Sequence, residues 1–453
     1  MQIYELSEKY QDYLADESKL QGMAQSISFP ESEQEVRTLT AYCRQNGVPI
    51  TIQGGKTGLS GGAVPQTGHL MNLSRMNHIK GLETRDGQQL LIVEAGVTLA
   101  DVHRYLLSAA KNKMWVPSPT EELCTVGGII ANGAKGISSY HYGDTARFLH
   151  RVRVVRADGS VEEIGRGREL ALLTGSEGTL GVITEAALIL TDKPESIWGI
   201  AFFFEDPEQA WACADAMREE TAAQDRAWVA ALEYLDGTAM ELVSRRRETS
   251  TKLQTLPDIH EQHRAMLYLE LEGREEEILS LAETLMETAS RFGSDPDESW
   301  ALTGETELEK MRAFRHAAPE AIGIELERVR RSVPDLYRLT GDFRFSTWST
   351  ERILKKYREL CQDRVRYCVF GHVGSRHLLL NLLPEDREEF ETARDILREL
   401  TRLVREDGGR IAAEQGIGRV RREYVTRADG YEELRACKRQ VDPEGIWNRQ
   451  NIF

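Results

Sequence analysis

The stretch ITIQGGKTGLSGGAVP, residues 50–65, decides the fold expected for this chain. Three residues that favour β-strands, Ile50 to Ile52, run into a loop with five glycines interleaved with Thr57 and Ser60. Glycine permits positive φ and close backbone approach, so successive N–H groups can converge on an anion. The loop follows neither the GxxxxGK[ST] order of P-loops nor the GxGxxG dinucleotide fingerprint. Alone, it is compatible with a phosphate site or with a ligand-free surface turn, and its neighbours decide between them.

Length and composition restrict the class of protein. At 453 residues the chain predicts two domains, or one large domain with an insertion. The formal net charge of −16 argues against nucleic acid or an anionic membrane as the main partner. No run of about eighteen apolar residues occurs, and the N-terminus is acidic and amphipathic, unlike a signal peptide. The sequence therefore predicts a cytoplasmic protein that is not transmembrane.

The six cysteines are scattered without any CxxC pair. This spacing excludes a cysteine-rich zinc or iron–sulfur site and is typical of free thiols in a reducing compartment. Any electrons that move through this chain are therefore not carried by a cluster in the same polypeptide.

Three further small-residue turns follow the first loop. They are PSPTEELCTVGGIIANGAKG at 117–136, YHYGD at 140–144 with the strand 151–164 behind it, and LLTGSEGTLGVITEAALIL at 172–190. Strand-like segments separate these turns, and a helix opening at Ser32 leads into the strand before the first loop. Four such turns within 190 residues predict a large cofactor that backbone amides approach repeatedly along a sheet.

The order of these motifs resembles the FAD-binding oxidoreductases of the vanillyl-alcohol oxidase (PCMH) family, and most of all the branch of D-lactate, glycolate and D-2-hydroxyglutarate dehydrogenases. The resemblance runs nearly end to end. It implies an α+β fold with a two-subdomain PCMH-type FAD-binding domain at 1–195, a ferredoxin-like α/β cap domain that carries the substrate side at 196–410, and a C-terminal segment at 411–453 that returns to the FAD domain. Within the cap, GGRIAAE at 408–414 is expected to be a strand.

The resemblance also implies which residues hold FAD. Some relatives attach FAD covalently to a histidine of the first loop, where this chain has Lys56, so non-covalent FAD is expected. Cys124 lies one residue away from a second attachment position, and a buried structural thiol is the expected role. The implied FAD contacts are Gln53, Gly54, Gly55, Lys56, Thr57, Gly58, Leu59, Ser60, Pro119, Thr120, Thr125, Gly128, Asn132, Gly133, Ile183, Glu185 and, in the closing motif, Asn448.

Oxidation of a 2-hydroxy acid requires a cation for the carboxylate, a base or metal for the hydroxyl proton, and a hydride acceptor, which flavin supplies. Family members carry GHxGDGNLH and a later EHG, whose two motif histidines and glutamate hold a metal in several relatives. Here the motifs read GHVGSRHLLLN at 371–381 and EQG at 414–416. His372 and Glu414 are kept, but Leu379 stands at the second ligand position and Gln415 at the position of the base.

His377 is a displaced imidazole that leaves three alternatives open. His372 and His377 are metal ligands, hydrogen-bonded structural histidines, or one of them is a metal-free base. Five residues of extended chain would place the two on opposite faces unless the GSR turn intervenes, and no metal ligands are assigned. Arg315 is the expected carboxylate cation, with Arg344 and Arg376 as further candidates.

Two functions are compatible with these motifs. The first is an FAD-dependent dehydrogenase of a small 2-hydroxy acid or related alcohol that passes electrons to a partner protein or quinone. The second is a flavin-holding electron-transfer or assembly subunit whose substrate pocket has degenerated, as Leu379 and Gln415 suggest. A non-hydride reaction on flavin, as in the alkyl-glycerone-phosphate synthase branch, is a third alternative without support in the cap.

Overall fold

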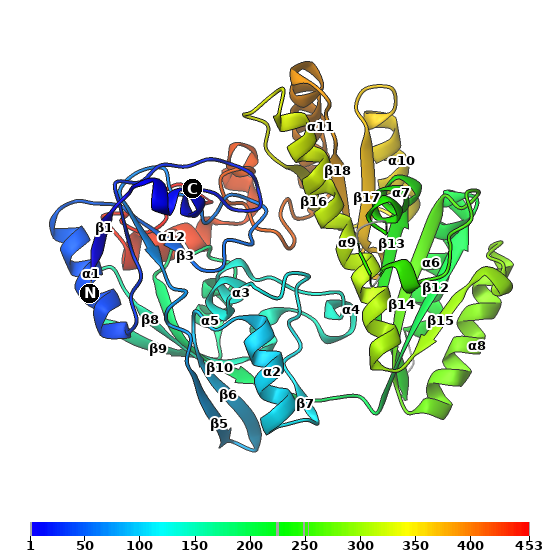
Figure 1. Ribbon diagram of the computed structural model, residues 1–453, viewed down its shortest axis with the longest axis horizontal. Coiled ribbons are helices and arrows are strands. Elements are labelled where there is room, and N and C mark those ends of the chain that lie inside the picture. Colours follow the sequence, from blue (N-terminus) through cyan, green and yellow to red (C-terminus); the bar gives the residue numbers. More distant parts are fainter. Residues whose placement is uncertain (1, 223–225, 248–249, 252, 453) are drawn as a thin grey trace. The chain divides into compact units, whose positions relative to one another are not determined.

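The computed structural model describes residues 2–222, 226–247, 250–251 and 253–452 (Figure 1). The chain divides into two compact units. Unit 1 consists of Met1–Gly136, Gly143–Lys193 and Glu414–Phe453, and unit 2 consists of Ile137–Tyr142 and Pro194–Ala413.

The first sheet of unit 1 carries the glycine loop. Its strands are β1 (Ile3–Glu5), β2 (Ser26–Ser28), β4 (His69–Asn72) and β3 (Ile50–Gln53), in that spatial order. β2 and β3 both run parallel to β4, while β1 is antiparallel to β2. Helix α1 (Glu33–Gln45) connects β2 to β3 and begins as expected, since the Ser32 side chain accepts the N–H of Glu35. The loop therefore leaves β3 at its C-terminal end.

The second sheet of unit 1 is antiparallel throughout. Its order is β5 (Ile79–Arg85), β6 (Gln88–Glu94), β10 (Val182–Ile189), β8 (Leu149–Val155) and β9 (Val161–Gly165). Every residue of the central strand β10 is buried. Among the described residues, the other α-helices and strands of the unit are α2 (Leu99–Ala109), α3 (Val126–Asn132), α5 (Arg168–Leu173), α12 (Glu432–Val441) and the short pair β7 (Lys113–Met114) and β11 (Thr191–Asp192).

Unit 2 is built on one seven-stranded antiparallel sheet. The pairs within it are antiparallel in every case. The spatial order is β15 (Trp300–Thr303), β12 (Ser196–Phe204), β14 (Ala265–Gly273), β13 (Ala227–Asp236), β17 (Tyr367–His372), β18 (His377–Leu382) and β16 (Leu339–Arg344).

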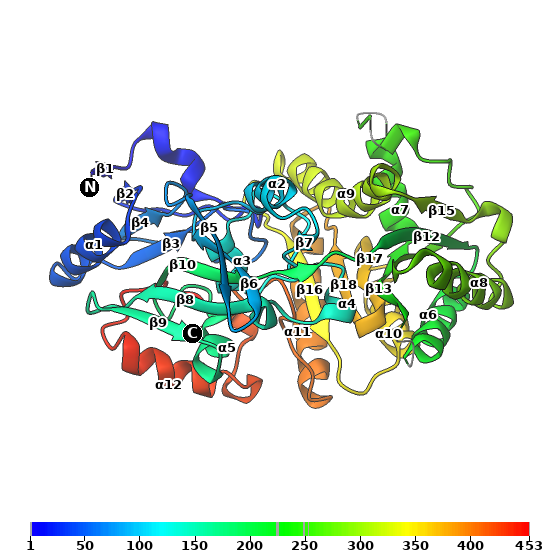
Figure 2. The same ribbon diagram turned by 90° about the horizontal axis from the view of Figure 1, so that it is seen from below.

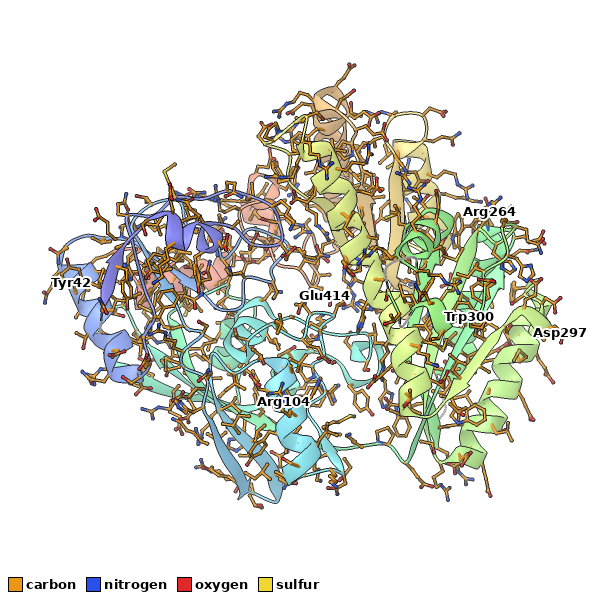
Figure 3. The ribbon with its side chains drawn as sticks, in the orientation of Figure 1. Tyr42, Arg104, Arg264, Asp297, Trp300 and Glu414 are labelled. Carbon is orange, nitrogen blue, oxygen red and sulfur yellow. The ribbon has the colours of Figure 1, made fainter. Side chains whose placement is uncertain are left out.

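Helices cover both faces of this sheet (Figure 2). One face is covered by α7 (Gly237–Arg246) and α9 (Glu305–Arg330), and the other by α6 (Pro207–Thr221), α8 (Glu275–Arg291), α10 (Thr350–Cys361) and α11 (Arg387–Glu406). Trp300 lies in the core on the α9 side, where its ring meets Phe203 and Phe314 edge-on (Figure 3). The alternation of strands and helices agrees with the α+β class expected from the sequence.

Two local features differ from what the sequence predicts. Residues 408–414 form no strand: only an isolated bridge joins Arg410 to Arg344, because the glycines that end α11 turn the chain there. The segment Ile137–Tyr142, which contains α4 (Ser139–Tyr142), belongs to unit 2 although both flanking segments belong to unit 1.

Among the described residues, none of the helices combines the length and the apolar character needed to cross a membrane.

Candidate active site

The glycine turns of unit 1 pack directly against each other. A Cβ on Gly54 would lie 2.3 Å from Thr125 Oγ1, and one on Gly55 would lie 2.5 Å from the carbonyl oxygen of Leu123. Thr125 also caps α3, since its hydroxyl accepts the N–H of Gly128 at 3.3 Å. The loop after β3 and the start of α3 therefore form one surface of closely spaced backbone that only glycine permits.

Gln53 anchors the first loop through its side chain. Its amide nitrogen donates to the carbonyl oxygens of Tyr13 (3.0 Å) and Ala63 (2.9 Å), and its amide oxygen accepts from Asn72 at 2.9 Å. Ser60 is tied to the C-terminal segment, because its carbonyl accepts the N–H groups of two residues there. The side chain of Gln53 thus shapes the loop, and a ligand would meet backbone N–H groups instead.

Glu177 and Asn448 join the fourth glycine-rich turn, at 172–190, to the C-terminal segment. Asn448 accepts the N–H of Ile52 at 2.8 Å and donates to the carbonyl of Glu177 at 2.7 Å. The Glu177 carboxylate accepts the N–H groups of Ile417 (2.6 Å) and Gly418 (2.7 Å). Burial raises the pKa of Glu177 to about 7, although these hydrogen bonds oppose the shift. Sequence reasoning missed Glu177, whose signal is an acidic residue in the glycine-rich turn TGSEGTLG.

Other predicted FAD contacts occupy varied positions in unit 1. Lys56 has a left-handed backbone (φ 61°), and its Nζ donates to the carbonyl of Asp12 at 2.9 Å. Asn132 donates to the carbonyl of Glu414 at 2.9 Å, and Gly133 ends α3 with φ 65°. Thr57, Leu59 and Pro119 are half-buried, whereas Gly58 and Thr120 are exposed.

Ile183 and Glu185, which were also expected to contact FAD, lie in β10. Ile183 is buried and pairs with Val154. The Glu185 carboxylate is held by Lys80 Nζ at 2.7 Å and by an Arg151 nitrogen at 2.9 Å. The Glu185 side chain is thus occupied by ion pairs, so its contact with FAD would have to come from the backbone.

The residues around the first loop fit a dinucleotide cofactor. Arg419, whose N–H binds the Ser60 carbonyl, has a buried Nη1 without a hydrogen-bond partner among the described residues. A positive donor and glycine backbone at the same loop are what a diphosphate requires. Cys124 is a free, buried thiol whose pKa is raised to about 12 by burial, which is unfavourable for covalent attachment.

In unit 2, His372 and His377 lie opposite each other on neighbouring strands. They are register partners of the β17–β18 hairpin, and their ring centroids are 5.4 Å apart. The GSR turn intervenes between them, so the two histidines do not lie on opposite faces as an uninterrupted extended chain would place them. A 3-10 turn, Val373–Ser375, followed by Arg376 with φ 54°, reverses the chain between them. Cross-strand partners point to the same face of a sheet.

Each of these imidazoles is oriented by a fully buried carboxylate. His372 Nδ1 lies 2.5 Å from Glu233 Oε1, and His377 Nε2 lies 2.6 Å from Asp342 Oδ1. Both carboxylate side chains are 0% exposed. This pairing fixes each ring and directs its other nitrogen toward a ligand, as carboxylate–histidine–metal arrangements do.

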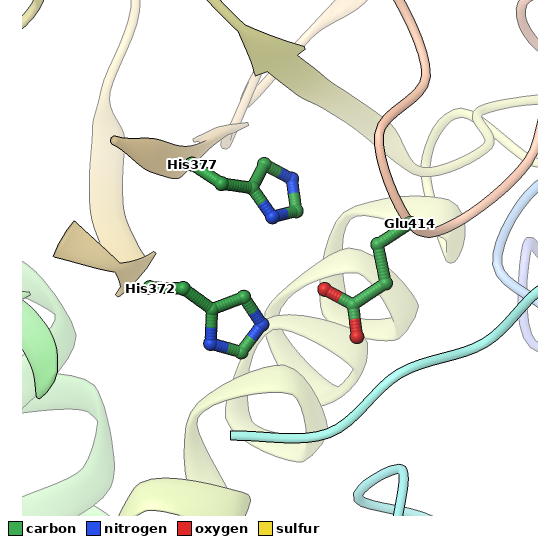
Figure 4. Close-up of side chains that lie close together, drawn as sticks. All are labelled: His372, His377 and Glu414. Carbon is green, nitrogen blue, oxygen red and sulfur yellow. The ribbon is translucent and has the colours of Figure 1, made fainter. Parts of the chain in front are cut away.

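Glu414 completes a possible ligand set. It directly follows Ala413, whose N–H donates to the carbonyl of Asp342 in β16 at 3.1 Å. One ligand atom from each of His372, His377 and Glu414 lies within 4.8 Å of the others, and the three side chains converge in Figure 4. Two imidazoles and a carboxylate are suitable ligands for a divalent transition metal. Leu379, at the family's second ligand position, packs in the hydrophobic core instead.

Arg315 is positioned by the same carboxylate that orients His372. Its Nε donates to Glu233 Oε2 at 2.7 Å, and its guanidinium lies 4.8 Å from the centre of the Phe370 ring. Burial by itself would raise the pKa of Glu233, but the charges and hydrogen bonds of His372 and Arg315 outweigh it and lower this pKa. Arg315 is only 3% exposed, and Glu233 is its one hydrogen-bond partner among the described residues.

Three further candidate residues, Arg344, Arg376 and Gln415, are not part of this buried cluster of Arg315, Glu233 and His372. Arg344 is exposed at the end of β16, and Arg376 occupies the left-handed position of the hairpin turn. The Gln415 side chain accepts a hydrogen bond from Arg421 at 2.7 Å. Gln415 is therefore held as a structural amide, and it cannot serve as a base near neutral pH.

Two family models match this chain: a FAD binding domain over residues 24–165 and the C-terminal domain of FAD linked oxidases over residues 193–452. The chain belongs to the family of FAD-linked oxidases. Its cofactor is FAD, as the sequence predicted, and the chain is an FAD-linked oxidoreductase.

Named relatives of this FAD-linked oxidase extend over almost its whole length. A D-lactate dehydrogenase of Anaerostipes hadrus is 28% identical and covers 98% of this chain and 92% of its own. The glycolate oxidase subunit GlcD of Bacillus subtilis is 26% identical, with coverages of 96% and 90%. The solved 4-ethylphenol oxidase of Gulosibacter chungangensis superposes with a TM-score of 0.75 at 18% identity over 100% of this chain and 94% of its own. This likeness confirms the predicted fold.

Proposed function

We propose that this FAD-linked oxidase oxidises a small 2-hydroxy acid to the 2-oxo acid and passes the electrons to a partner protein or quinone. The observation that carries the proposal is the buried set of Arg315, Glu233 and His372, which combines a carboxylate-binding cation with an oriented imidazole. The names of the two relatives, a D-lactate dehydrogenase and a glycolate oxidase subunit, support the same class of substrate.

Arg315 would bind the substrate carboxylate. Its Nε is used by Glu233, so the terminal nitrogens of the fork remain for a bidentate contact. Glu233 keeps the guanidinium in place before substrate arrives, which reduces the entropy lost on binding. FAD, held non-covalently by the glycine turns of unit 1, supplies the oxidising chemistry by accepting the α-hydrogen with its electron pair.

His372, His377 and Glu414 would hold a divalent metal ion. Such an ion would act as a Lewis acid on the substrate hydroxyl and favour its deprotonation. In this assignment His377 takes over the ligand role that Leu379 cannot perform, and Asp342 and Glu233 orient the two imidazoles from behind.

The experiment is anaerobic mixing of the purified protein, with FAD bound, with D-lactate, glycolate, D-2-hydroxyglutarate and sugar acids. The proposal expects at least one of them to bleach the visible flavin band. Arg315→Met should abolish bleaching at the same substrate concentration while FAD content stays unchanged. If no acid reduces the flavin, the proposed activity is wrong even though the cofactor assignment stands.

The metal assignment has its own test. Elemental analysis after dialysis against a trace divalent metal should find about one ion per chain. His377→Gln should lower the metal content, whereas His103→Gln, in unit 1, should not. Equal metal content in the two variants would count against the ligand set.

A second candidate function is a flavin-holding electron-transfer or assembly subunit. The observation that favours it is Gln415, whose amide is tied to Arg421 where a base would be expected. This alternative predicts FAD that none of the acids reduces, together with co-purification of another redox protein.

A further inference from the structure

The N-terminal segment of unit 1 lies directly on the first glycine loop. Gln53, at the end of β3, donates its side-chain amide to the carbonyl oxygen of Tyr13 at 3.0 Å. Lys56 Nζ donates to the carbonyl oxygen of Asp12 at 2.9 Å. Both carbonyl groups belong to the 3-10 helix Glu8–Leu14. The chain that leaves this helix is therefore held against the loop that carries the expected FAD contacts.

Asp16 follows this helix, and its carboxylate faces the loop. A Cβ on Gly58 would lie 3.6 Å from Asp16 Oδ2. The backbone N–H of Ala63 is also near enough to lower the pKa of this carboxylate, although it forms no hydrogen bond to Oδ2. These two neighbours place the Asp16 side chain beside residues 58–63 of the loop.

One carboxylate oxygen of Asp16 is satisfied and the other is not. Oδ1 accepts the N–H of Ser18 at 2.9 Å and the Ser18 hydroxyl at 2.5 Å. Oδ2 is buried without a hydrogen-bond partner among the described residues, and the whole residue is only 6% exposed. Burial raises the pKa of Asp16 to about 6, so at about pH 8 the side chain is ionised and Oδ2 can accept a hydrogen bond. Buried polar atoms normally have a partner, which this oxygen lacks within unit 1 as described.

The C-terminal segment brings a cation to the same loop. The backbone N–H of Arg419 donates to the Ser60 carbonyl at 2.9 Å. Two of the three guanidinium nitrogens of Arg419 lie beside the Gln66 side chain. The third, Nη1, is buried and has no hydrogen-bond partner in the described part of the chain. Nη1 is therefore a donor that remains for a ligand.

Gly61 lies between the acidic and the basic group. A Cβ on Gly61 would be 3.4 Å from Ser18 Oγ, the hydroxyl that binds Asp16, and 3.5 Å from Arg419 Cβ. Burial lowers the pKa of Arg419, and the negative charge of Asp16 opposes that shift. Asp16 Oδ2 and Arg419 Nη1 nevertheless form no hydrogen bond with each other. A ligand that accepts from the guanidinium and donates to the carboxylate would satisfy both buried groups.

We propose that Asp16 and Arg419 together bind FAD at and beside its diphosphate. Arg419 Nη1 donates to the phosphate oxygens, and Asp16 Oδ2 accepts a hydrogen bond from a hydroxyl group of an adjoining sugar. FAD carries hydroxyls on both sides of its diphosphate, on the ribityl chain of the flavin and on the ribose of the adenosine. Cations recognise phosphate, and carboxylates recognise sugar hydroxyls in other dinucleotide sites. This inference concerns the cofactor and does not depend on which substrate the enzyme oxidises.

The first test measures the Kd of FAD for FAD-free protein at about pH 8, from the change in flavin fluorescence. Asp16→Ala should raise this Kd by about 10–100-fold, because a hydrogen bond to a charged group is lost. The isosteric Asp16→Asn keeps an acceptor for Ser18 and should raise the Kd by a smaller factor, which also serves if the alanine variant does not fold. Glu17→Gln is the matched control and should bind FAD as the wild type does, since the Glu17 carboxylate is exposed and pairs with Lys19. A wild-type Kd in the Asp16 variants would overturn the proposal.

The second test separates recognition of a hydroxyl from a general effect on the loop. Pyrophosphate, FMN and ADP compete with FAD in equilibrium dialysis, which gives a Ki for each. Pyrophosphate has no sugar, so Asp16→Ala should not raise its Ki, whereas Arg419→Met should. FMN carries only the ribityl chain and ADP only the ribose, so the one whose Ki rises in Asp16→Ala identifies the hydroxyl. If Asp16→Ala raises all three Ki values equally, or raises neither that of FMN nor that of ADP, Asp16 does not bind a sugar hydroxyl and the proposal is wrong.

Discussion

Among single residues, Glu233 is the carboxylate that contacts two candidate site residues of unit 2 at once. One carboxylate orients both Arg315 and His372, and its side chain is 0% exposed. Removing one partner of a buried ion pair leaves the other charges uncompensated and costs about 3–5 kcal/mol. Glu233→Gln should therefore lower the free energy of unfolding by that amount and raise the KM for the acid substrate.

Glu272→Gln is the matched control for Glu233→Gln. Glu272 is another buried carboxylate of the same sheet, bound by Tyr142 and by Trp228 Nε1 at 3.1 Å. The Glu272→Gln variant should show a lower free energy of unfolding in urea, while its KM for the acid substrate stays near the wild-type value. A KM that rises equally in the two variants would mean that Glu233 acts through general stability and does not position Arg315.

Glu177 gives the apo-protein a predictable pH dependence. Its folded pKa of about 7 exceeds the ordinary value of 4.5, because burial disfavours the carboxylate. The contribution of the protonated side chain is thus complete below about pH 4.5 and is lost as the pH rises through about 7, a change of about 3 kcal/mol. Urea unfolding of FAD-free protein at about pH 5 and about pH 8 should show this loss.

Glu177→Gln should remove most of that pH dependence, since glutamine does not titrate. It should also lower stability at both pH values, because only one acceptor atom remains for the N–H groups of Ile417 and Gly418. A wild-type slope in the variant would assign the pH dependence to other groups.

At the scale of elements, the β17–β18 hairpin sets the distance between the two histidines. Gly374 lies in its turn, and a Cβ there would come within 2.8 Å of two ring carbons of Tyr140. Gly374→Ala should therefore displace the turn and reduce bound metal and flavin reduction together. Gly165→Ala is the control, because a Cβ at Gly165 meets nothing within 4 Å. Normal metal content in Gly374→Ala would show that the turn tolerates the shift.

The glycine turns and the β17–β18 hairpin differ in how far their structure follows from the local sequence. The glycine turns of unit 1 were predictable because clustered glycines are a local signal: few other residues adopt the positive φ or allow the close backbone approach that such turns need. The position of His377 was not, because the face it occupies depends on a left-handed arginine in the turn, and arginine carries no signal for that conformation.

At the scale of the whole molecule, unit 1 is assembled from three separate segments of the chain. Asn448, in the third segment, connects it to the other two through Ile52 and Glu177. Its backbone φ is 36°, which asparagine tolerates better than most residues. Asn448→Ala should cost about 2–4 kcal/mol in urea unfolding, from two lost hydrogen bonds and backbone strain.

Asn46→Ala is the control for Asn448→Ala. Asn46 is exposed and makes one side-chain hydrogen bond, at 2.7 Å, within its own helix end. Its loss should cost less than about 1 kcal/mol. Similar losses in the two variants would mean that the tail contributes little to the FAD domain.

The most direct measurement on the whole enzyme is anaerobic flavin bleaching by a 2-hydroxy acid carrying deuterium at the α-carbon. If this FAD-linked oxidase removes that hydrogen with its electron pair, bleaching is slower with the deuterated acid, and Arg315→Met is not bleached by either form. Equal rates for the two acids under single-turnover conditions, or undiminished bleaching of Arg315→Met, would contradict the assignment of 2-hydroxy-acid oxidation to this site.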